Sequence, residues 1–343
     1  MKLQTLMAVA LVGATSALAS AAGLSGAGST FAEPLYKRWG EMYAAQDAAK
    51  GPIAYEGVGS GEGLNRILAK KVDFGASDEP LKRSELEEKG LRQFPVAMGA
   101  IVPVVNLPGI PAGELKLNAD VLAKIYLGKI KRWNEADILN LNDGLPKKAL
   151  DVPIKPVYRA DGSGSTFVFS YYLASQSPAW KSGPGIAKEL RGVTGLAAKG
   201  TGGVVDAVKA NVGAIGYVDY GRAIKDKLNI SQLPNRVGVF MKVNNESIQA
   251  AVKYEAERSI YSDDADFYLV LANNDTYGGW PLATATFVLL PRKEKDINKV
   301  LSFLVWGLKN GDAVAKELGY VPLTETLKVA VRKAWSQQYG FKL

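Results

Sequence analysis

The sequence contains no cysteine and no histidine among its 343 residues. Without cysteine the chain forms no disulfide, and it lacks the thiolate that serves many metal sites and covalent catalysts. Without histidine it forms neither a Ser-His-Asp triad nor an imidazole metal site. These absences exclude many classes of enzyme, and a catalytic site would have to be built from carboxylates, lysines or serine alone.

Beyond its first residues the sequence has no run apolar enough to span a membrane, and the first residues resemble an export signal. Lys2 supplies a positive start and the run Leu6–Val12 is apolar. Ala17–Ala19 and Ala19–Ala21 both fit the small-x-small cleavage rule, so we expect a signal peptide over residues 1–21. A membrane anchor is the alternative, which the interspersed Thr and Ser residues disfavour. Because no cysteine is available for lipid attachment, we expect a periplasmic, exported, soluble protein that is not lipid-anchored.

The charge of the chain is basic but carries no nucleic-acid signature. The formal net charge is +8, and Lys2 is the only charged side chain of the expected signal peptide, so the remainder has +7. The basic residues are scattered along the chain, which favours a role in solubility over a dedicated anion-attracting surface. There is no zinc-finger spacing, basic zipper or aromatic RNA-binding motif, so we expect no nucleic-acid partner.

Short β-type runs alternate with amphipathic helical segments, which is typical of an α/β fold. The length suits about two domains, and no long Pro/Gly/Ser linker separates them. The expected strands are Leu24–Gly28, Ile53–Val58, Val96–Val105, Val152–Tyr158, Ala214–Val218 and Ala285–Leu290. The expected helices carry Leu35, Trp39, Met42 and Tyr43 on one face, then Leu64, Ile67, Leu68 and Val72, and later the segment from Phe167 to Ala174.

Three of the expected strand-to-helix turns combine glycine with hydroxyl residues. The first N–H groups of a helix have no intrahelical partner, and the helix dipole adds partial positive charge there. Glycine lets an anion approach the backbone, and Ser or Thr hydroxyls add donors. One such turn is usually a helix cap, but three in one chain shift the balance toward an anion site. The turns are Gly26–Phe31, Gly57–Gly61 and Asp161–Thr166.

None of these turns is a nucleotide-binding loop or a nucleophile elbow. The chain has no G-x-x-x-x-G-K-[ST], no suitably placed G-x-G-x-x-G and no G-x-S-x-G. The expected anion is therefore small and free. Arg159, just before the third turn, can donate two parallel bonds to an oxyanion, and Asp161 can orient it. Asp78 follows a strand-like run and on its own is typical of a turn.

With these residues collected, the chain resembles the periplasmic phosphate-binding proteins of bacterial phosphate-specific ABC transporters. The resemblance covers essentially the whole chain after the expected signal. Its specificity comes from the order and spacing of several motifs. These are Gly26–Phe31, Val72–Asp78, Ile125–Trp133, Arg159–Gly164, Gly213–Val218 and Trp280–Leu282.

The resemblance implies a periplasmic-binding-protein (type II) fold, with two α/β lobes joined by two hinge crossings and the ligand in the cleft. The crossings are expected near Gly99–Asn106 and Pro281–Leu290. The first lobe would then comprise residues 24–100 and 281–343, and the second lobe residues 101–280. The resemblance also implies inorganic phosphate as ligand, no cofactor, a transmembrane permease of an ABC transporter as partner, and a monomer.

The phosphate-binding residues are likewise implied by the resemblance, position by position. Asp161 would brace Arg159. The family commonly has Thr at Ser165, where the hydroxyl is retained, and relatives often carry Gly at Glu62, where a carboxylate near the anion would repel it unless it points to solvent. The implied ligands are Thr30, Phe31 through its backbone N–H, Ser60, Asp78, Arg159, Ser163, Gly164 and Ser165.

Two alternatives stay open from the residues. A receptor for another tetrahedral oxyanion, such as sulfate or molybdate, would use the same donors. A secreted phosphatase on the same lobes would need a nucleophile and metal ligands. The densest carboxylate group is Asp263, Asp264 and Asp266, which is more typical of a solvated acidic turn.

Overall fold

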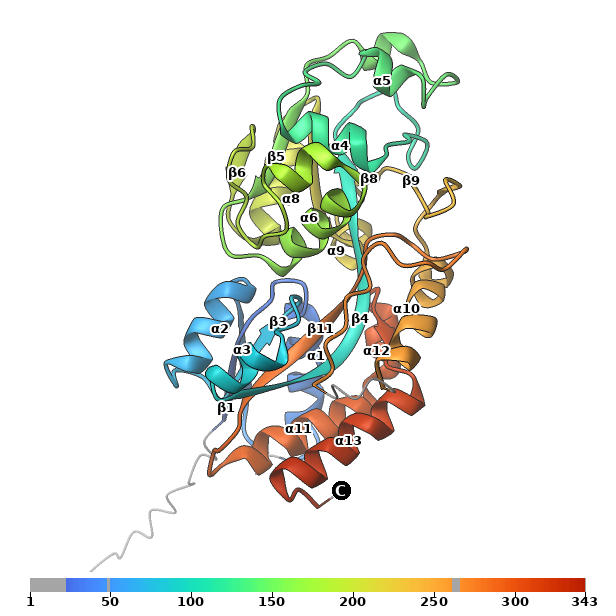
Figure 1. Ribbon diagram of the computed structural model, residues 1–343. Helices are drawn as coiled ribbons and strands as arrows, with labels where there is room; N and C mark the ends of the chain where they lie inside the picture. The colour runs from blue at the N-terminus through green and yellow to red at the C-terminus, as the bar shows by residue number, and fades with distance from the viewer. Residues whose placement is uncertain (1–22, 48–49, 261–265, 343) are drawn as a thin grey trace, which may run out of the picture.

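The computed structural model describes residues 23–47, 50–260 and 266–342, with the backbone alone for residues 254–260. The expected signal peptide and Asp263 and Asp264 therefore lie outside the described residues. Figure 1 shows an elongated molecule of two α/β lobes, one at each end of the long strand β4 (Leu91–Val105). We call the lobe that holds β1 the first lobe and the lobe that holds β5 the second lobe.

The first lobe is built on four strands besides the first part of β4, with helices packed around them. The strands are β1 (Leu24–Gly28), β2 (Ile53–Gly57), β3 (Phe74–Ser77) and β11 (Ala283–Pro291), with the short β12 (Val321–Pro322) at the edge of β4. The helices are α1 (Glu33–Ala44), α2 (Ser60–Leu68), α3 (Arg83–Glu88), α11 (Ile297–Asn310), α12 (Asp312–Glu317) and α13 (Glu325–Tyr339).

The second lobe is built on the end of β4 and on three strands that follow it in the chain. These strands are β5 (Lys155–Arg159), β6 (Leu196–Ala198) and β7 (Ala214–Asp219), and short pieces are β8 (Asn229–Ile230), β9 (Leu233–Pro234) and β10 (Phe240–Met241). The helices are α4 (Ala119–Tyr126), α5 (Ala136–Leu139), the 3-10 helix η2 (Lys147–Leu150), α6 (Gly164–Gln176), α7 (Pro178–Ser182), α8 (Gly200–Ala210) and α9 (Tyr220–Lys225).

One continuous strand order, β2-β1-β3-β11-β4-β7-β5-β6, runs through both lobes. β1 pairs in parallel with β2 and β3, so the turns that follow these strands meet at one edge of the first lobe. β5 pairs in parallel with β6 and β7, which gathers their carboxyl ends in the same way in the second lobe. Parallel strands bury both faces, which explains their runs of small and apolar residues.

The two lobes are joined where β4 changes partners. β4 pairs with β11 through Ala100 and with β7 from Ile101 onward. A second passage of the chain lies against this point, since the Ile101 N–H donates to Leu282 O at 2.9 Å. The Trp280 indole N–H donates to Ile101 O, also at 2.9 Å. The backbone of Ile101 is therefore bonded on both sides by the returning chain.

The helix α10 (Asn245–Ile260) precedes this return but packs on the first lobe. It contacts α13, β11 and β12, and in Figure 1 it lies beside the first lobe's helices. Gln93 of β4 also reaches this region, because its side-chain amide donates to Asp266 O at 3.0 Å. The segment before Pro281 is thus shared between the lobes.

The expected elements match the structure in kind and differ at their ends. β1 has the expected bounds, and the apolar face of α1 is buried at Leu35, Trp39 and Tyr43. The second helix was expected to reach Val72, which is wrong: α2 ends at Leu68, and Lys70 takes a positive φ of 54°. The strand expected from Val152 begins only at Lys155.

An aromatic cluster supports the first lobe beneath the turn between β1 and α1. Tyr36 stacks on Tyr55 with ring centroids 4.8 Å apart, and both rings contact Phe74. All three side chains are buried. Large rings of this kind bury much apolar area and fix the helix against the sheet, so the turn rests on a rigid base.

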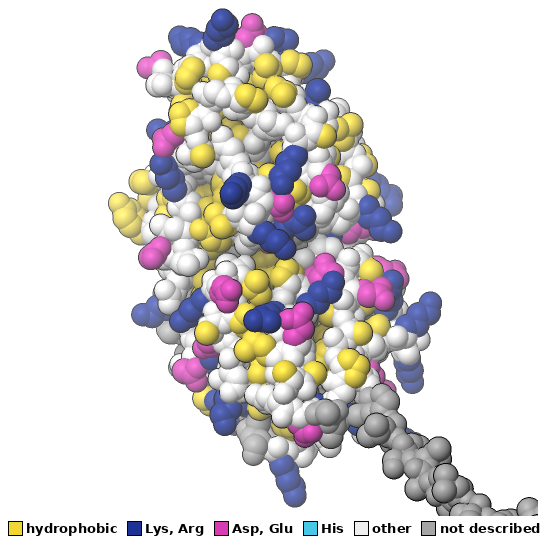
Figure 2. Space-filling view, turned by 180° about the vertical axis from the view of Figure 1, so that it is seen from behind, with side chains coloured by type: hydrophobic (Ala, Val, Ile, Leu, Met, Phe, Trp, Pro, Cys, Tyr) yellow, Lys and Arg dark blue, Asp and Glu magenta, His cyan; other side chains and the backbone are white. Residues whose placement is uncertain are grey.

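Charged side chains are distributed widely over the surface in Figure 2. Lys and Arg extend over both lobes on the face shown, with Asp and Glu between them. Among the described residues, no helix has the length and apolar character that a membrane crossing requires.

Candidate anion-binding site between the lobes

The turn from β1 to α1 is held in a fixed conformation. Gly28 has φ 145°, and a Cβ there would overlap the backbone of Ala76, so glycine is required. The Ser29 N–H donates to Ala76 O at 3.0 Å, and the Tyr55 hydroxyl donates to Ser29 O at 2.9 Å. Tyr320 donates its hydroxyl to Phe31 O. The carbonyls of Ser29 and Phe31 are therefore both bonded by buried tyrosines.

These bonds decide where the N–H groups of the turn point. In a trans peptide the C=O and the following N–H lie on opposite sides. Since Tyr55 binds Ser29 O, the Thr30 N–H points away from Tyr55. The Thr30 hydroxyl reaches the second lobe, where it is bonded to the hydroxyl of Thr201 at 2.8 Å and accepts from Arg159 Nη1 at 3.2 Å.

Ser60 is the first residue of α2 and links the two lobes. Its Oγ accepts the N–H of Asp78 and the N–H of Gly164, each at 3.2 Å. The side chain is buried. The N-terminus of α2 is therefore directed at the N-terminus of α6, and both helix dipoles place positive potential between the lobes.

Asp78 follows β3 and is a buried carboxylate, with 3 % of its surface exposed. Its Oδ2 accepts the Ser29 hydroxyl at 2.7 Å. Burial raises the pKa of Asp78 to about 6, against the hydroxyls of Ser29 and Thr286 and the charge of Arg159, which lower it. Within the described residues Asp78 Oδ1 has no hydrogen-bond partner. The carboxylate thus keeps unused acceptor capacity.

Arg159 ends β5 and points its guanidinium across to the first lobe. Its Nε donates to Asp161 Oδ1 at 2.8 Å, and its Nη2 pairs with Asp161 Oδ2. Asp161 Oδ1 also accepts the Gly200 N–H at 2.8 Å. Burial raises the pKa of Asp161, but the bonds and charge of Arg159 outweigh it, and the net shift is downward. Asp161 therefore fixes the position of the Arg159 guanidinium.

The N-terminus of α6 brings three further expected residues to the same place. Ser163 caps the helix, because its Oγ accepts the Thr166 N–H at 3.2 Å. A Cβ on Gly164 would lie 2.6 Å from Asp78 Cβ and 2.7 Å from Ser60 Oγ, so only glycine fits between the lobes here. Ser165 is buried in the first turn of the helix.

The expected site residues are thus gathered at one junction of the lobes. Thr30 contacts Arg159, and Ser60 and Asp78 face Gly164, while Ser163 and Ser165 flank it. Phe31 turns its ring away onto Tyr320, with centroids 5.1 Å apart, and offers only its backbone. Glu62 lies on the exposed side of α2, where it accepts from Arg66 Nε at 3.0 Å. That hydrogen bond lowers the pKa of Glu62.

Sequence reasoning missed several residues that build this junction. Ser29 was within a recognised turn but was not singled out. Thr201 lies in a glycine-rich segment, Gly200–Gly203, at the start of α8, which carries the same glycine and hydroxyl signal as the other turns. Tyr217, whose hydroxyl accepts the Arg159 N–H at 3.3 Å, contributes only through contacts distant in sequence, as do Tyr55 and Tyr320.

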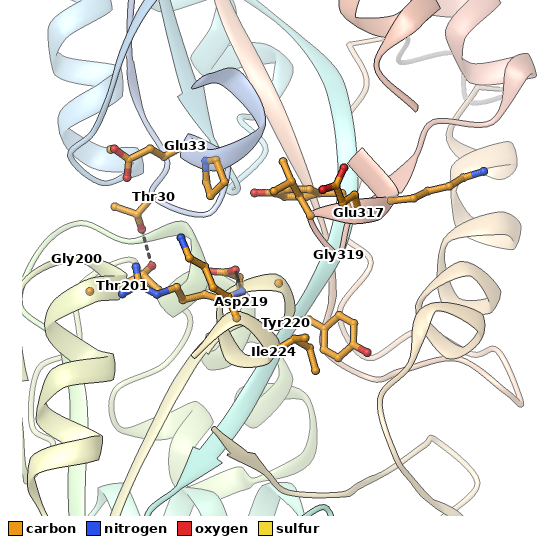
Figure 3. Close-up of a pocket in the computed structure, with 18 of the residues that line it drawn as sticks. Thr30, Glu33, Gly200, Thr201, Asp219, Tyr220, Ile224, Glu317 and Gly319 are labelled. Atoms are coloured by element: carbon orange, nitrogen blue, oxygen red, sulfur yellow. Dashed lines mark hydrogen bonds between the residues drawn. The ribbon is translucent and has the colours of Figure 1, made fainter. Parts of the chain in front are cut away.

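A groove of about 650 Å³ opens beside Thr30 between the lobes. Figure 3 shows Thr30 and Glu33 of the first lobe facing Gly200 and Thr201 of the second, with the hydroxyl bond between Thr30 and Thr201. Asp219 lies on its second-lobe wall. In residues 23–47, 50–260 and 266–342 no group of three or more acidic side chains is placed to hold a metal ion.

The chain is similar to known proteins over most of its length. Residues 13–309 match the PBP superfamily domain. The chain is 40 % identical to the Phosphate-binding protein PstS of Xylella fastidiosa strain Temecula1 over 319 residues, covering 92 % of this chain and 85 % of that protein. It is 38 % identical to the protein of the same name from Haemophilus influenzae over 327 residues, covering 94 % of this chain and 96 % of that protein.

Solved structures show the same fold. A crystal structure with bound phosphate from Clostridium perfringens matches with a TM-score of 0.61 at 18 % identity, covering 88 % of this chain and 100 % of that one. A phosphate-binding protein from Stenotrophomonas maltophilia matches with a TM-score of 0.68 at 22 % identity, covering 91 % and 94 %.

Proposed function

The chain belongs to the phosphate-binding proteins of the PBP superfamily, and from this premise we propose that it captures inorganic phosphate between its lobes and delivers it to an ABC permease. The relatives named for phosphate binding cover nearly the whole chain, and the fold has the two lobes that such capture needs. The lobes close around an anion when both contribute ligands to it.

The observation that carries the proposal is that the carboxylate of Asp78, a hydrogen-bond acceptor, lies among hydrogen-bond donors at the junction of the lobes. Hydroxyls, two helix N-termini and the braced Arg159 suit a dehydrated oxyanion. Asp78 would repel such an anion unless the anion itself brought a proton to bond. Phosphate near neutral pH carries at least one P–OH group, and sulfate carries none. We assign the ligands to Thr30, Phe31 through its N–H, Ser60, Asp78, Arg159, Ser163, Gly164 and Ser165, with Asp161 in support.

Calorimetric titration of phosphate-depleted protein tests this function. Phosphate should bind with a stoichiometry of one, and sulfate should give no heat at concentrations that saturate with phosphate. Comparable binding of sulfate or molybdate would replace the proposal with a receptor for another oxyanion.

We infer that the protein is a receptor and not an enzyme. The absence of histidine and cysteine from the sequence supports this, because a phosphatase needs a nucleophile or metal ligands. Incubation with a chromogenic phosphate ester, with and without divalent metals, should release no product above background. Turnover that disappears in an Arg159→Ala variant would overturn the inference.

The protein's location, oligomeric state and lobe boundaries are part of the same proposal. We propose export to the periplasm with loss of residues 1–21, which the mass of protein purified from cells tests. A monomer is expected, and light scattering of the eluted peak checks it. We propose that the lobes divide near residues 100 and 281. Because α10 packs on elements of the first lobe, we assign Asn245–Ile260 to that lobe. Comparison of phosphate-free and phosphate-bound crystal structures would show with which lobe α10 moves.

A further inference from the structure

Ser29 lies in the first turn of the site, beside the carboxylate of Asp78. It is buried, with 1 % of its surface exposed. Its Oγ donates to Asp78 Oδ2 at 2.7 Å and accepts the Ala32 N–H at 3.1 Å. Its backbone is fixed at both ends, by Ala76 O and by the Tyr55 hydroxyl. Ser29 therefore has little freedom to turn its hydroxyl elsewhere.

The direction of these hydrogen bonds determines whether Asp78 acts as a donor or as an acceptor toward a bound anion. A serine hydroxyl has one hydrogen to donate. Since the Ala32 N–H can only donate, it uses an acceptor site of Ser29 Oγ, and the hydroxyl hydrogen goes to Asp78. An ionised carboxylate has about four acceptor sites, of which Ser29 uses one. Asp78 is thus held as an acceptor, with its Oδ2 close to the Gly164 face of the second lobe.

We propose that Ser29 sets the anion specificity of the site by donating its only hydroxyl hydrogen to Asp78, which keeps Asp78 a pure acceptor that only a protonated oxyanion can satisfy. The inference rests on the proposed function, since it concerns the choice between phosphate and other oxyanions at that site. Ser29 acts through Asp78 and is a positioning residue, not a ligand.

Asp78 has two forms, an ionised carboxylate and a neutral carboxyl, whose populations depend on its surroundings. Burial favours the neutral carboxyl, and the Ser29 hydroxyl favours the ionised one. A neutral Asp78 carries an O–H and can donate to a bare oxygen of sulfate. Loss of the Ser29 hydroxyl raises the pKa of Asp78, so the neutral form extends to higher pH and rejection of sulfate weakens. The Thr286 hydroxyl of β11 also lowers the pKa of Asp78 and remains in a Ser29 variant. The other groups that face Asp78 are Arg159 from β5, Asp219 at the end of β7, Tyr36 of α1, Tyr55 of β2 and Tyr320 before β12.

The tyrosine neighbours stay neutral over the pH range of Asp78, whereas Asp219 titrates within it. Tyr36, Tyr55 and Tyr320 are buried, which raises the pKa of each hydroxyl and keeps it neutral. Asp219 shares the titration range of Asp78, because burial raises its pKa to about 6 as well. Asp219 is present in both wild type and the Ser29 variant, and repulsion couples its titration to that of Asp78. The difference between the two proteins therefore reports on this pair of carboxyls, with the Ser29 hydroxyl as the only group changed.

The experiment is a sulfate titration of phosphate-depleted protein by calorimetry at several values from about pH 5 to about pH 8.5. Sulfate keeps its charge in this range, whereas phosphate itself gains and loses a proton. Sulfate affinity of wild type should fall as pH rises through the titration of Asp78. In Ser29→Ala the fall should begin at a higher pH. Sulfate affinity at about pH 7.5 should then exceed that of wild type roughly tenfold for every pH unit that separates the two profiles.

Two matched variants separate the hydroxyl from the fold. Ser29→Thr keeps a hydroxyl and should return the pH profile toward wild type. Ser77→Ala removes the neighbouring buried hydroxyl, which donates to Glu79 O at 2.8 Å and not to Asp78, and should leave the profile unchanged. An unmoved profile in Ser29→Ala, with both anions weakened alike, would make Ser29 only a structural residue and overturn the proposal. Failure of wild type to bind phosphate would instead contradict the proposed function.

Discussion

Gly221 of α9 lies directly against the carbonyl oxygen of Leu318, so closely that a Cβ on Gly221 would overlap it. Gly319 is part of the same contact, since a Cβ added to Gly319 would lie 2.9 Å from Gly221 Cα. α9 belongs to the second lobe, whereas Leu318 and Gly319 follow α12 of the first. Two backbones thus meet here without side chains between them, on the wall of the groove in Figure 3.

Gly221→Ala should therefore hinder closure without touching the proposed phosphate ligands. The added methyl group meets a backbone atom that cannot rotate away, so the lobes have to separate. We expect phosphate affinity at least about tenfold weaker, a change of about 1.4 kcal/mol. The radius of gyration in saturating phosphate, measured by small-angle scattering, should exceed that of wild type.

Gly202→Ala is the matched control for this variant. Gly202 lines the same groove, but a Cβ there meets no atom within 4 Å. Its affinity and scattering should equal those of wild type. Equal behaviour of the two variants would mean that the contact of Gly221 with Leu318 does not govern closure.

Arg159→Ala should weaken phosphate binding by about 2–5 kcal/mol, the scale for removing one partner of a buried charge pair. The variant also leaves the partly buried Asp161 without its cation. Arg159→Lys keeps the charge but loses the planar guanidinium, so its phosphate affinity should lie between those of wild type and Arg159→Ala. Calorimetry measures all three proteins, and a loss below about 1 kcal/mol in Arg159→Ala would place the residue outside the site.

That the candidate residues meet at one junction was predictable, because their signals are local in sequence. Gly28 and Gly164 are required by close backbone approach, and the hydroxyls beside them mark helix starts. Each such turn carries its signal within about six residues. The pairing of Arg159 with Asp161 is likewise only two residues long. Parallel pairing of the strands then brings these local signals together.

The remaining parts depend on distant contacts that no local pattern records. Tyr320 binds Phe31 O across 289 positions of sequence, and in the sequence it is one tyrosine among many. The packing of α10 on α13 depends on how the chain returns after β10. The end of α2 was placed too late because Val72 continues the apolar spacing, whereas the backbone turns at Lys70.

Asp219→Asn should change the pH dependence of folding stability. Asp219 caps α9, since its Oδ1 accepts the Arg222 N–H at 2.7 Å, and Asn preserves such a cap. Burial raises the pKa of Asp219 to about 6 in the folded state, above its unfolded value. The stability it contributes is therefore present below about pH 4 and is lost as pH rises through about pH 6. The loss should be on the order of 2–3 kcal/mol.

Urea unfolding in phosphate-free buffer measures this effect as the stability of wild type minus that of the variant. The difference should decrease between about pH 4 and about pH 6 and then stay level. The contribution of Asp161 is common to both proteins and cancels, whereas the difference includes the repulsion between Asp219 and Asp78, which is one cause of the raised pKa of Asp219. If the difference is constant over this range, ionisation of Asp219 does not lower the stability of the folded protein.

Asp78→Asn tests the choice of phosphate over sulfate most directly. Asn removes the charge and supplies N–H donors in nearly the same volume. Wild type should ignore sulfate at concentrations far above those that saturate with phosphate, because sulfate would place an unprotonated oxygen against a buried carboxylate. That penalty is several kcal/mol, or roughly a thousandfold in affinity. Asp78→Asn should keep phosphate binding and narrow this gap, since its amide can donate to either anion.

The measurement is a titration of both anions into both proteins at one pH above about 7 and one salt concentration, where Asp78 is ionised. Salt is held constant because screening alters every anion contact. Loss of phosphate binding together with unchanged rejection of sulfate would mean that Asp78 only supports the fold. If Asp78 acts as an acceptor, Asp78→Asn should bind sulfate more tightly than wild type does, while its phosphate affinity changes by less than about tenfold. Removal of the acceptor favours sulfate selectively, because only sulfate is penalised by the carboxylate.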